Sequence, residues 1–395
     1  MSRDYAKAWP TGGPRVLMTD CWLQNAGDAA IAVATQRMIR RYAPDAVVLH
    51  AAYGAEVVGA RYPELTLVPP LDALLGTRWS EPDRTSGIDG PALVAGADLI
   101  ISQGGGFLRE GYQPWARIDA LLRATELVGG ISLLGQTIGV FDRAFARQAF
   151  GEILHRAHAV LVRDRQSWSS AVDLGADPAI VHLGTDFSLD MVESASLEPD
   201  RGSVAPPAEA LGVGVVLSDH VVPGESADRA GVGARLLEAV LKRSGSDPVT
   251  VWSSSQGIPR DSEDDVVARA AVELLSPTGR RRITVVPGHL DAYDVFRWSR
   301  AFPSLVSMRF HPALLAAAQG IPSVLAMSDP KVAFFDGSPM RDWVVVGHDA
   351  AAAERAAAMA IPGSGPVDPQ VLLGSVWERL KVNQQVVADL LAGVG

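Results

Sequence analysis

Residues 304–322 read SLVSMRFHPALLAAAQGIP, and this stretch decides the fold that we expect. Residues 305–308 predict a short buried strand, and residues 313–319 predict a helix that Gly320 ends. Pro312 suits the first turn of that helix, because a proline there has no N–H hydrogen bond to lose. The stretch is therefore a strand followed by a helix, the unit from which α/β sheets are built.

Arg309 and His311 lie where this strand ends and the helix begins. In open α/β sheets, ligands bind at the carboxyl ends of the strands, and a helix N-terminus favours an anion. Arg309 adds a planar fork of donors suited to phosphate or carboxylate, and His311 can exchange protons near neutral pH. The pattern predicts an anion site beside a catalytic histidine. The alternative is that His311 only caps the helix and Arg309 pairs with a neighbouring carboxylate.

The composition limits the class of protein. At 395 residues the chain exceeds the usual size of a single hydrophobic core, so we expect two domains. The net charge of −10 argues against a protein that binds nucleic acids irrespective of their sequence. The single cysteine, Cys21, excludes an intramolecular disulfide, and the histidines do not have the spacing of metal ligands. We therefore expect no metal.

The sequence also gives an expectation of location. Residues 1–14 lack the apolar segment of a signal peptide, and no uncharged apolar run reaches the roughly 18 residues of a transmembrane helix. We therefore expect a cytoplasmic protein. The alternative within this expectation is a peripheral protein at the inner face of the membrane.

Strands alternate with helices in the first half, and this rhythm predicts a parallel, doubly wound sheet. The predicted strands are residues 15–20, 46–50, 97–102, 131–134, 159–162 and 180–183. The predicted helices are residues 29–41, 71–75, 118–128, 144–156 and 166–174, the first with Asp28 as its N-cap. Apart from the short helix, residues 53–91 predict loops.

The second half repeats the rhythm after a polar, proline-containing break. We expect an N-terminal Rossmann-like domain at 1–195, a linker at 196–210, a C-terminal Rossmann-like domain at 211–366, and a final helix within 367–395 that packs back across the domain junction. The predicted strands are residues 212–217, 249–252, 283–286, 305–308, 324–327 and 343–346. The predicted helices are residues 229–243, 262–275, 292–299, 312–319, 349–360 and about 369–391.

Two doubly wound domains predict a cleft that the carboxyl ends of both sets of strands face. The motifs divide between its walls, with Asn25–Asp28, Gly104–Gly106, Gln136 and Arg163 on one and Arg309–His311 on the other. Each candidate in the first half has a structural alternative. The three glycines can serve close packing of a strand against a helix alone, Asp28 can be a plain N-cap, and Arg163 can pair with Asp164.

These motifs occur in the order seen in polysaccharide pyruvyl transferases, which the chain resembles from Val16 to Phe335. The matching segments are Asn25-Ala26-Gly27-Asp28, Gly104-Gly105-Gly106, residues 135–139 (GQTIG), Val162-Arg163-Asp164 with Ser167, Arg309-Phe310-His311, and residues 320–322 followed by Asp329-Pro330-Lys331 and Phe334. Three segments depart from the family pattern, namely Thr185-Asp186, Leu217-Ser218-Asp219 and Met327-Ser328-Asp329, and these departures concern the acceptor and the donor.

The resemblance implies two Rossmann-like domains in a GT-B-like arrangement, phosphoenolpyruvate as the donor, and a pair of sugar hydroxyls as the acceptor. The product would be a pyruvate ketal, with release of phosphate and with no cofactor beyond the co-substrate. By motif, the donor-binding residues fall on Arg163, Arg309 and His311, and His311 would be the catalytic one.

Further candidates complete the expected site. Phe310 and the glycines Gly104, Gly105 and Gly106 would contact the donor, and Lys331 would be a peripheral phosphate contact. The acceptor would bind to Asn25, Asp28 and Gln136, and it would be a sugar or a lipid-linked glycan.

Two other functions stay open. One is a nucleotide-sugar glycosyltransferase of GT-B type. Such an enzyme would need an acidic residue after a strand of the second domain to bind the ribose of the donor. The other is a non-catalytic relative that binds glycans or anions.

Overall fold

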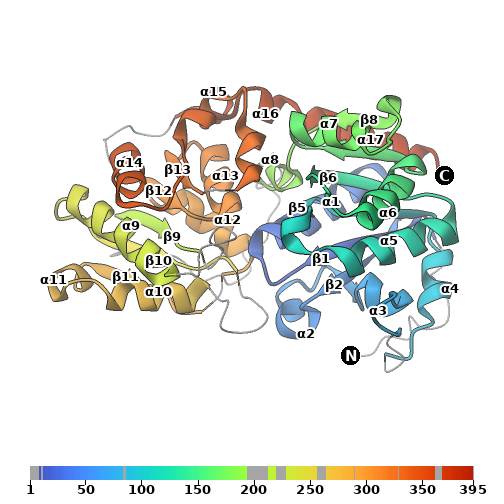
Figure 1. Cartoon of the computed structure of the whole chain (residues 1–395), viewed down its shortest axis with the longest axis horizontal. Helices are drawn as coiled ribbons and strands as arrows, with labels where there is room; N and C mark the ends of the chain where they lie inside the picture. The colour runs from blue at the N-terminus through green and yellow to red at the C-terminus, as the bar shows by residue number, and fades with distance from the viewer. Residues whose placement is uncertain are drawn as a thin grey trace. The chain divides into compact units, whose positions relative to one another are not determined.

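The computed structural model of the chain describes residues 9, 12–82, 86–193, 212–218, 228–255, 264–288, 290–327, 329–360 and 367–394 (Figure 1). Its contacts divide the chain into two units. The first unit comprises Met1–Leu23, Ile31–Asp190 and Glu378–Gly395, and the second comprises Gln24–Ala30 and Met191–Trp377. The predicted linker at 196–210 and the domain borders at 195 and 211 lie outside the described residues.

The first unit is built on a parallel sheet with the strand order β3-β2-β1-β4-β6-β7-β8, in which β5 pairs with β6. The strands are β1 (Arg15–Trp22), β2 (Val47–Tyr53), β3 (Thr66–Val68), β4 (Leu99–Ser102), β5 (Gly105–Leu108), β6 (Ser132–Ile138), β7 (Ala159–Val162) and β8 (Val181–Leu183). The order reverses between β1 and β4, as in a Rossmann sheet.

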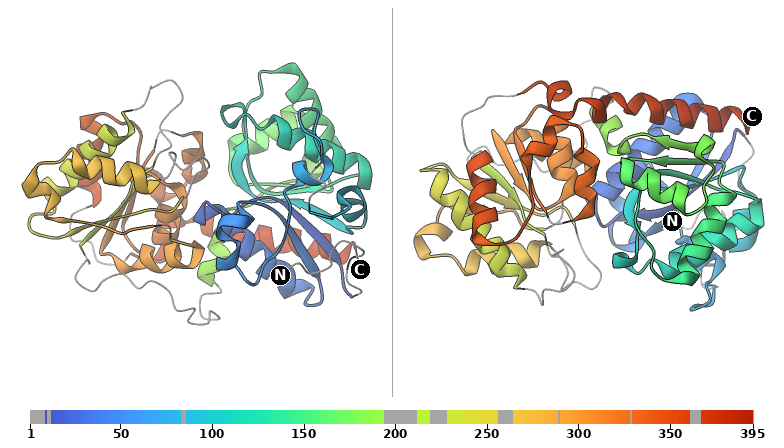
Figure 2. Two further views of the ribbon diagram at one scale, coloured as in Figure 1. Left: turned by 90° about the horizontal axis from the view of Figure 1, so that it is seen from below. Right: turned by 45° about the horizontal axis from the view of Figure 1, so that its top comes forward.

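Helices cover the sheet of the first unit (Figures 1 and 2). They are α1 (Ala26–Tyr42), α2 (Ala55–Val58), α3 (Leu71–Leu75), α4 (Gly90–Ala95), α5 (Trp115–Val128), α6 (Ala144–His155), α7 (Arg165–Asp173) and α17 (Leu380–Ala392). The short helix α8 (Asp190–Glu193) starts at a residue of the first unit, and its other residues are assigned to the second. Both faces are therefore buried, and strands such as β4 and β7 are apolar along nearly their whole length, as expected for a parallel sheet. The prediction of a doubly wound sheet is confirmed here.

The second unit has the strand order β11-β10-β9-β12-β13-β14, again parallel throughout. Its strands are β9 (Val213–Val216), β10 (Val249–Trp252), β11 (Ile283–Val285), β12 (Ser304–Ser307), β13 (Ser323–Ala326) and β14 (Val344–Val345). Its helices are α9 (Arg229–Arg243), α10 (Asp264–Glu273), α11 (Pro277–Arg280), α12 (Ala292–Ala301), α13 (Phe310–Ala318), α14 (Ala350–Ala360), α15 (Pro369–Leu373) and α16 (Ser375–Glu378). Both units are therefore Rossmann-like, as predicted.

The C-terminal segment differs from the prediction of one long helix. Gly374, with a φ of 48°, ends α15 and separates it from α16 and α17. A positive φ suits glycine and interrupts a helix. The pieces pack in different units, because α15 contacts the helix α13 of the second unit whereas α17 contacts β7 of the first. Within the described residues, no helix is long and apolar enough to cross a membrane.

His50 provides a test of the first unit's core. The side chain is fully buried in β2, and this burial lowers its pKa from the ordinary 6.5 to about 3. The unfolded state therefore binds a proton between these values that the folded state does not bind. Stability from this group is complete above about pH 6.5 and is lost as the pH falls toward 3.

We expect the free energy of unfolding of the wild type to fall between pH 7 and pH 5 by about 2 kcal/mol more than that of His50→Gln. Urea denaturation at the two pH values measures this difference. Equal pH slopes in the two proteins would contradict the buried, neutral state of His50.

Candidate functional site

The Arg309-Phe310-His311 segment lies at the switch point of the second sheet. It follows β12, and β12 pairs with β9, where the strand order reverses. Neighbouring connections leave such a point toward opposite faces of the sheet, and the space between them is where open α/β sheets bind ligands.

α13 begins at Phe310, two residues before the predicted start at Pro312. Pro312 is thus the third helical residue, where the first-turn N–H groups have no intrahelical partner and a proline loses nothing. Arg309 is the N-cap, and it makes no side-chain capping bond. Ser307 holds its backbone, because Oγ accepts from the N–H of Arg309 at 3.0 Å and donates to its carbonyl at 2.6 Å. His311 therefore lies inside the first turn and is not the cap.

Arg309 forms a two-point ion pair with Asp264. Its Nε lies 3.0 Å from Oδ2 of Asp264, and its Nη2 lies 2.5 Å from Oδ1. The carboxylate is fully buried, whereas the arginine side chain keeps 14% of its exposure. The carboxylate pairing that we considered as the alternative is therefore present. A two-point ion pair also fixes the plane of the guanidinium.

The place of His311 on a cleft wall predicts an exposed side chain, and this prediction is wrong, because the residue is only 8% exposed. The cause is the segment Gln24–Ala30, which belongs to the second unit. The N–H of Ala26 donates to the carbonyl of Ser254 at 2.9 Å, and Asn25 forms an antiparallel bridge with Ser255. A Cβ on Gly27 would overlap Nδ1, Cγ and Cβ of His311. Two motifs predicted on facing walls are thus in direct contact.

The start of α1 also differs from the prediction. The helix begins at Ala26, and the N-cap role falls to Asn25 and not to Asp28. Asn25 Oδ1 accepts from the N–H of Gly27 at 2.9 Å, and its carbonyl accepts from the N–H of Ala29. An asparagine oxygen on the first-turn amides is a favourable cap. Asp28 is half-buried in that first turn.

Phe310 packs its ring against the ring of His311 and against two further phenylalanines. It is almost fully buried, and its ring centroid lies 5.2 Å from those of His311 and Phe334 and 5.5 Å from that of Phe335. Both phenylalanines belong to the 3₁₀ helix η8 (Pro330–Phe335). Lys331 lies on the same helix, and its N–H donates to Oδ1 of Asp329 at 2.8 Å. This packing fixes the position of His311, and donor contacts by Phe310 and Lys331 stay predictions.

Arg163 lies in the core of the first unit. It is 1% exposed, its Nη1 lies 2.5 Å from Oδ2 of Asp186, and its Nε donates to Oγ1 of Thr137 at 2.7 Å. Asp164 has another task, since it caps α7 by accepting from the N–H of Ser167. The ion pair of Arg163 is therefore with Asp186 and not with Asp164. Donor binding by Arg163 stays a prediction.

Gly104 and Gly105 permit close packing between strands, whereas the structural alternative that we named was packing between a strand and a helix. A Cβ on Gly104 would lie 2.7 Å from the carbonyl oxygen of Gly135, and Gly105 pairs with Gln136 across β5 and β6. Gln136 is fully buried, and its amide donates to the carbonyl of Gln103 at 2.5 Å. Ligand contacts by Gln136, Gly104, Gly105 and Gly106 stay predictions.

The sequence analysis missed Asp264 and Ser254. Asp264 begins α10 and lies in an acidic run, in which nothing in the sequence distinguishes it from Asp261, Glu263 or Asp265. Ser254 is the second residue after β10, so its place just beyond a strand end was the available signal. Among the residues that the structure describes, no group of three or more histidine, cysteine or acidic residues could hold a metal ion.

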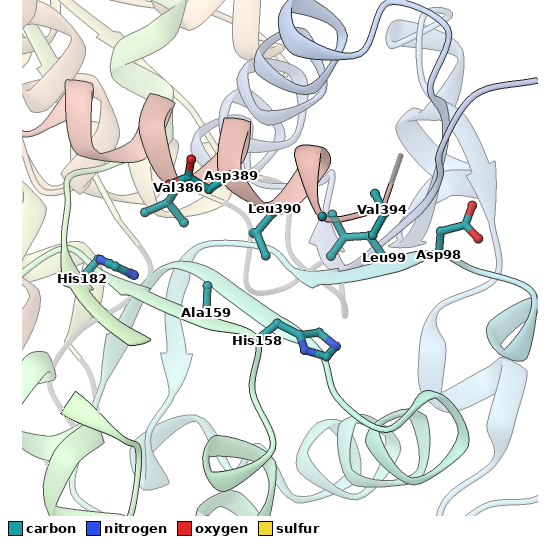
Figure 3. Close-up of a pocket in the computed structure, with 10 residues that line it drawn as sticks. Asp98, Leu99, His158, Ala159, His182, Val386, Asp389, Leu390 and Val394 are labelled. Atoms are coloured by element: carbon teal, nitrogen blue, oxygen red, sulfur yellow. The ribbon is translucent and has the colours of Figure 1, made fainter. Parts of the chain in front are cut away.

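A cavity of about 380 Å³ lies elsewhere, beneath α17 in the first unit (Figure 3). Asp98 and His158, which line it, precede β4 and β7. It therefore adjoins the amino ends of these strands, the edge opposite to the one where this class of sheet binds ligands.

The contact between Gly27 and His311 gives a test of the site. We expect Gly27→Ala to displace the imidazole, because the new methyl group would meet the ring and Cβ of His311, and to lower the free energy of unfolding by roughly 1–3 kcal/mol. Ring resonances of His311 in NMR spectra and thermal denaturation measure the two effects. Gly111→Ala is the control, since a Cβ there would meet nothing within 4 Å. If His311 resonates identically in both variants, the contact is absent.

Comparisons with known proteins give the fold and the family. No curated protein matches the sequence. Among solved structures, the UDP-N-acetylglucosamine 2-epimerase of Rickettsia bellii matches with a TM-score of 0.59 at 12% identity, over 97% of each chain. A putative enzyme of the same name from Listeria monocytogenes matches with a TM-score of 0.57 at 11% identity, over 94% of each chain. HepE of Anabaena, solved with UDP and glucose, matches with a TM-score of 0.55 at 13% identity, over 96% of this chain and 98% of its own.

At such low identity these likenesses show the fold alone, which is GT-B-like. The sequence match is more specific, because the family model described as polysaccharide pyruvyl transferase covers residues 25–329. It begins at the asparagine that caps α1 and extends past His311, so it includes both motifs that meet at Gly27. On this match, the chain belongs to the polysaccharide pyruvyl transferase family.

Proposed function

We propose that the protein transfers pyruvate from phosphoenolpyruvate to a pair of hydroxyls on a sugar, forming a pyruvate ketal and releasing phosphate. The family match supports a transferase that acts on a polysaccharide. The observation that carries the proposal is the contact of Gly27 with His311, which joins the two motifs at the switch point of the second sheet.

The start of α13 offers what a donor with a phosphate and a carboxylate needs. Its first-turn N–H groups and its dipole favour an anion. Arg309 adds donors whose plane Asp264 fixes, and a planar guanidinium matches two oxygens of a phosphate or carboxylate. We assign the donor to this helix start, with Lys331 as a further phosphate contact.

The proposed reaction has two additions and one departure at the same carbon. A proton adds to C3 of phosphoenolpyruvate, so that C3 becomes a methyl group and C2 becomes electrophilic. One sugar hydroxyl adds to C2, the C2–O bond to phosphate breaks, and the second hydroxyl closes the ketal ring. The two hydroxyl protons end on C3 and on phosphate, so no oxidant or further cofactor is needed.

His311 is the group that we assign to the proton transfers. An imidazole both accepts and donates near neutral pH, and such catalysis contributes typically about 10²–10⁴-fold. Its low exposure helps, because a site with little water protects a reactive C2 centre from hydrolysis. The backbone of Gly27 and the ring of Phe310 both lie against the imidazole.

The remaining parts of the proposal follow the family. Asn25 and Asp28 lie in the segment that contacts His311, and we assign them to the acceptor. We place the reaction in the cytoplasm or at the inner face of the membrane, with a sugar or a lipid-linked glycan as acceptor and with no cofactor beyond phosphoenolpyruvate.

We expect His311→Gln to lower kcat by about 10²–10⁴-fold, because glutamine can hydrogen-bond but cannot exchange a proton in this range. Phosphate release from phosphoenolpyruvate, assayed over galactosides, mannosides and glucosides, measures the effect. His155→Gln, at an exposed position on α6, is the control and should keep the wild-type rate. Turnover of a UDP- or GDP-sugar without turnover of phosphoenolpyruvate would instead identify a glycosyltransferase.

We expect Arg309→Lys to raise the KM for phosphoenolpyruvate at least about tenfold, because an ammonium cannot keep the two-point grip of Asp264 and also present a planar pair of donors. Steady-state kinetics with varied donor measures this change. Arg297→Lys is the matched control, since Arg297 also pairs with an aspartate, Asp294, at 2.9 Å in the same unit. An unchanged KM in Arg309→Lys would remove Arg309 from the donor site.

A further inference from the structure

Three aromatic rings and one guanidinium lie in successive contact at the carboxyl edge of the first unit's sheet. Trp22 ends β1 and Tyr53 ends β2, and their ring centroids lie 5.2 Å apart. Cζ of Arg117, in the first turn of α5, lies 5.1 Å from the Tyr53 ring centroid and 4.3 Å from that of Phe107. All four residues are half-buried.

Asp20 holds Arg117, one of these four residues, in place. Its Oδ1 lies 3.0 Å from Nε of Arg117, and its Oδ2 accepts from the hydroxyls of Thr19 and Ser102 at 3.0 and 2.8 Å. The residue is 2% exposed and has a φ of 64°, at a point where the pairing of β1 with β2 shifts register. A left-handed backbone at a non-glycine residue is strained, and such strain concentrates at functional sites.

The cluster keeps hydrogen-bonding groups that have no partner in the described part of the chain. Among the residues that the structure describes, Nη1 and Nη2 of Arg117 have no hydrogen-bond partner. Asp72 accepts through Oδ1 from the hydroxyl of Tyr53 at 2.9 Å and from the N–H of Ala73 at 3.1 Å. Its Oδ2 has no partner within the same described part of the chain. Donors and an acceptor thus remain beside these half-buried aromatic residues.

The position of the cluster is that of a ligand site. β1 and β4 are neighbours at the point where the order of the first sheet reverses. Asp20 lies near the end of β1, and Ser102 ends β4. Open α/β sheets bind ligands in the crevice outside this edge. The cluster therefore occupies, in the first unit, the place that Arg309 and His311 occupy in the second.

The chemistry of the cluster selects the ligand. The guanidinium of Arg117 is already paired with Asp20, and Asp72 adds a carboxylate beside Tyr53, so an anion would meet no excess of positive charge, and a metal ion would meet the arginine. A sugar ring has apolar C–H faces that pack on aromatic rings, and each of its hydroxyls both donates and accepts hydrogen bonds. We infer that Trp22, Tyr53, Phe107, Asp72 and Arg117 form a saccharide subsite for a neutral sugar, with Asp20 positioning Arg117. Its use for the acceptor of the transfer rests on the proposed function, whereas sugar binding as such does not.

The test is a titration of the full chain with the methyl glycosides of galactose, mannose and glucose, without phosphoenolpyruvate. We expect at least one to bind, detected by calorimetry and by saturation-transfer NMR. Arg117→Lys and Asp72→Asn should each weaken binding about tenfold or more, because each removes a hydrogen bond that involves a charged group. Arg123→Lys is the matched control, since Arg123 lies on the same helix and pairs with Asp119 at 3.2 Å. It should bind as the wild type does.

Three outcomes would overturn the inference. They are no binding of any glycoside, equal binding by the wild type and both cluster variants, and displacement of the bound glycoside by inorganic phosphate. If Arg117→Lys unfolds because Asp20 loses its partner, Asp72→Asn decides, since an amide oxygen can still accept from Tyr53. Phosphate release from phosphoenolpyruvate separates the two proposals. If a glycoside binds and both cluster variants weaken its binding, but no phosphate is released, only the proposed transfer is refuted. If phosphate is released and Asp72→Asn leaves the KM for the acceptor unchanged, only the subsite is refuted.

Discussion

The backbone at Gly27 lies against the imidazole of His311, and the rest of the candidate site depends on this contact. The contact requires a glycine in the first turn of α1 and a histidine in the first turn of α13. Different residues fix the position of each helix start. Asn25 and Ser254 fix the start of α1, whereas Ser307 and Phe310 fix the start of α13. Gly27 and His311, which are far apart in the sequence, thus become neighbours because of the path of the main chain.

The two sheets explain why polar groups gather at such points. In both units the strand order reverses next to the first strand, so the adjoining loops diverge and leave room at the carboxyl edge. In the second unit this edge carries Arg309 and His311 at a helix start. In the first it carries Asp20 and Arg117 among aromatic rings. The same architecture therefore offers an anion-favouring place and a place suited to neutral polar ligands.

Most of the fold could be predicted from the sequence, because buried parallel strands are apolar runs such as residues 99–102 and 159–162, and glycines end many of the helices. β5 could not be predicted, since its glycines read as a turn until β6 lies against them. The helix starts at Ala26 and Phe310 were missed because contacts with Ser254 and Ser307 decide them.

The candidate site was predictable in part. Arg309 and His311 could be recognised from their place between a strand and a helix, and the Asn25–Asp28 motif from its sequence. Their partners could not be recognised, because Asp264 is one acid among several and its role depends on a fold-level contact. The burial of His311 likewise follows from Gly27, which sequence spacing does not bring near it.

The grip of Asp264 on Arg309 has a consequence for how this family can diverge. Removing either partner of such an enclosed ion pair leaves a charge that water no longer solvates, at a penalty of about 3–5 kcal/mol. Single substitutions at either position are therefore selected against even where the lost activity could be tolerated. The two positions should be inherited as a unit, so that homologues retain both residues or have exchanged both.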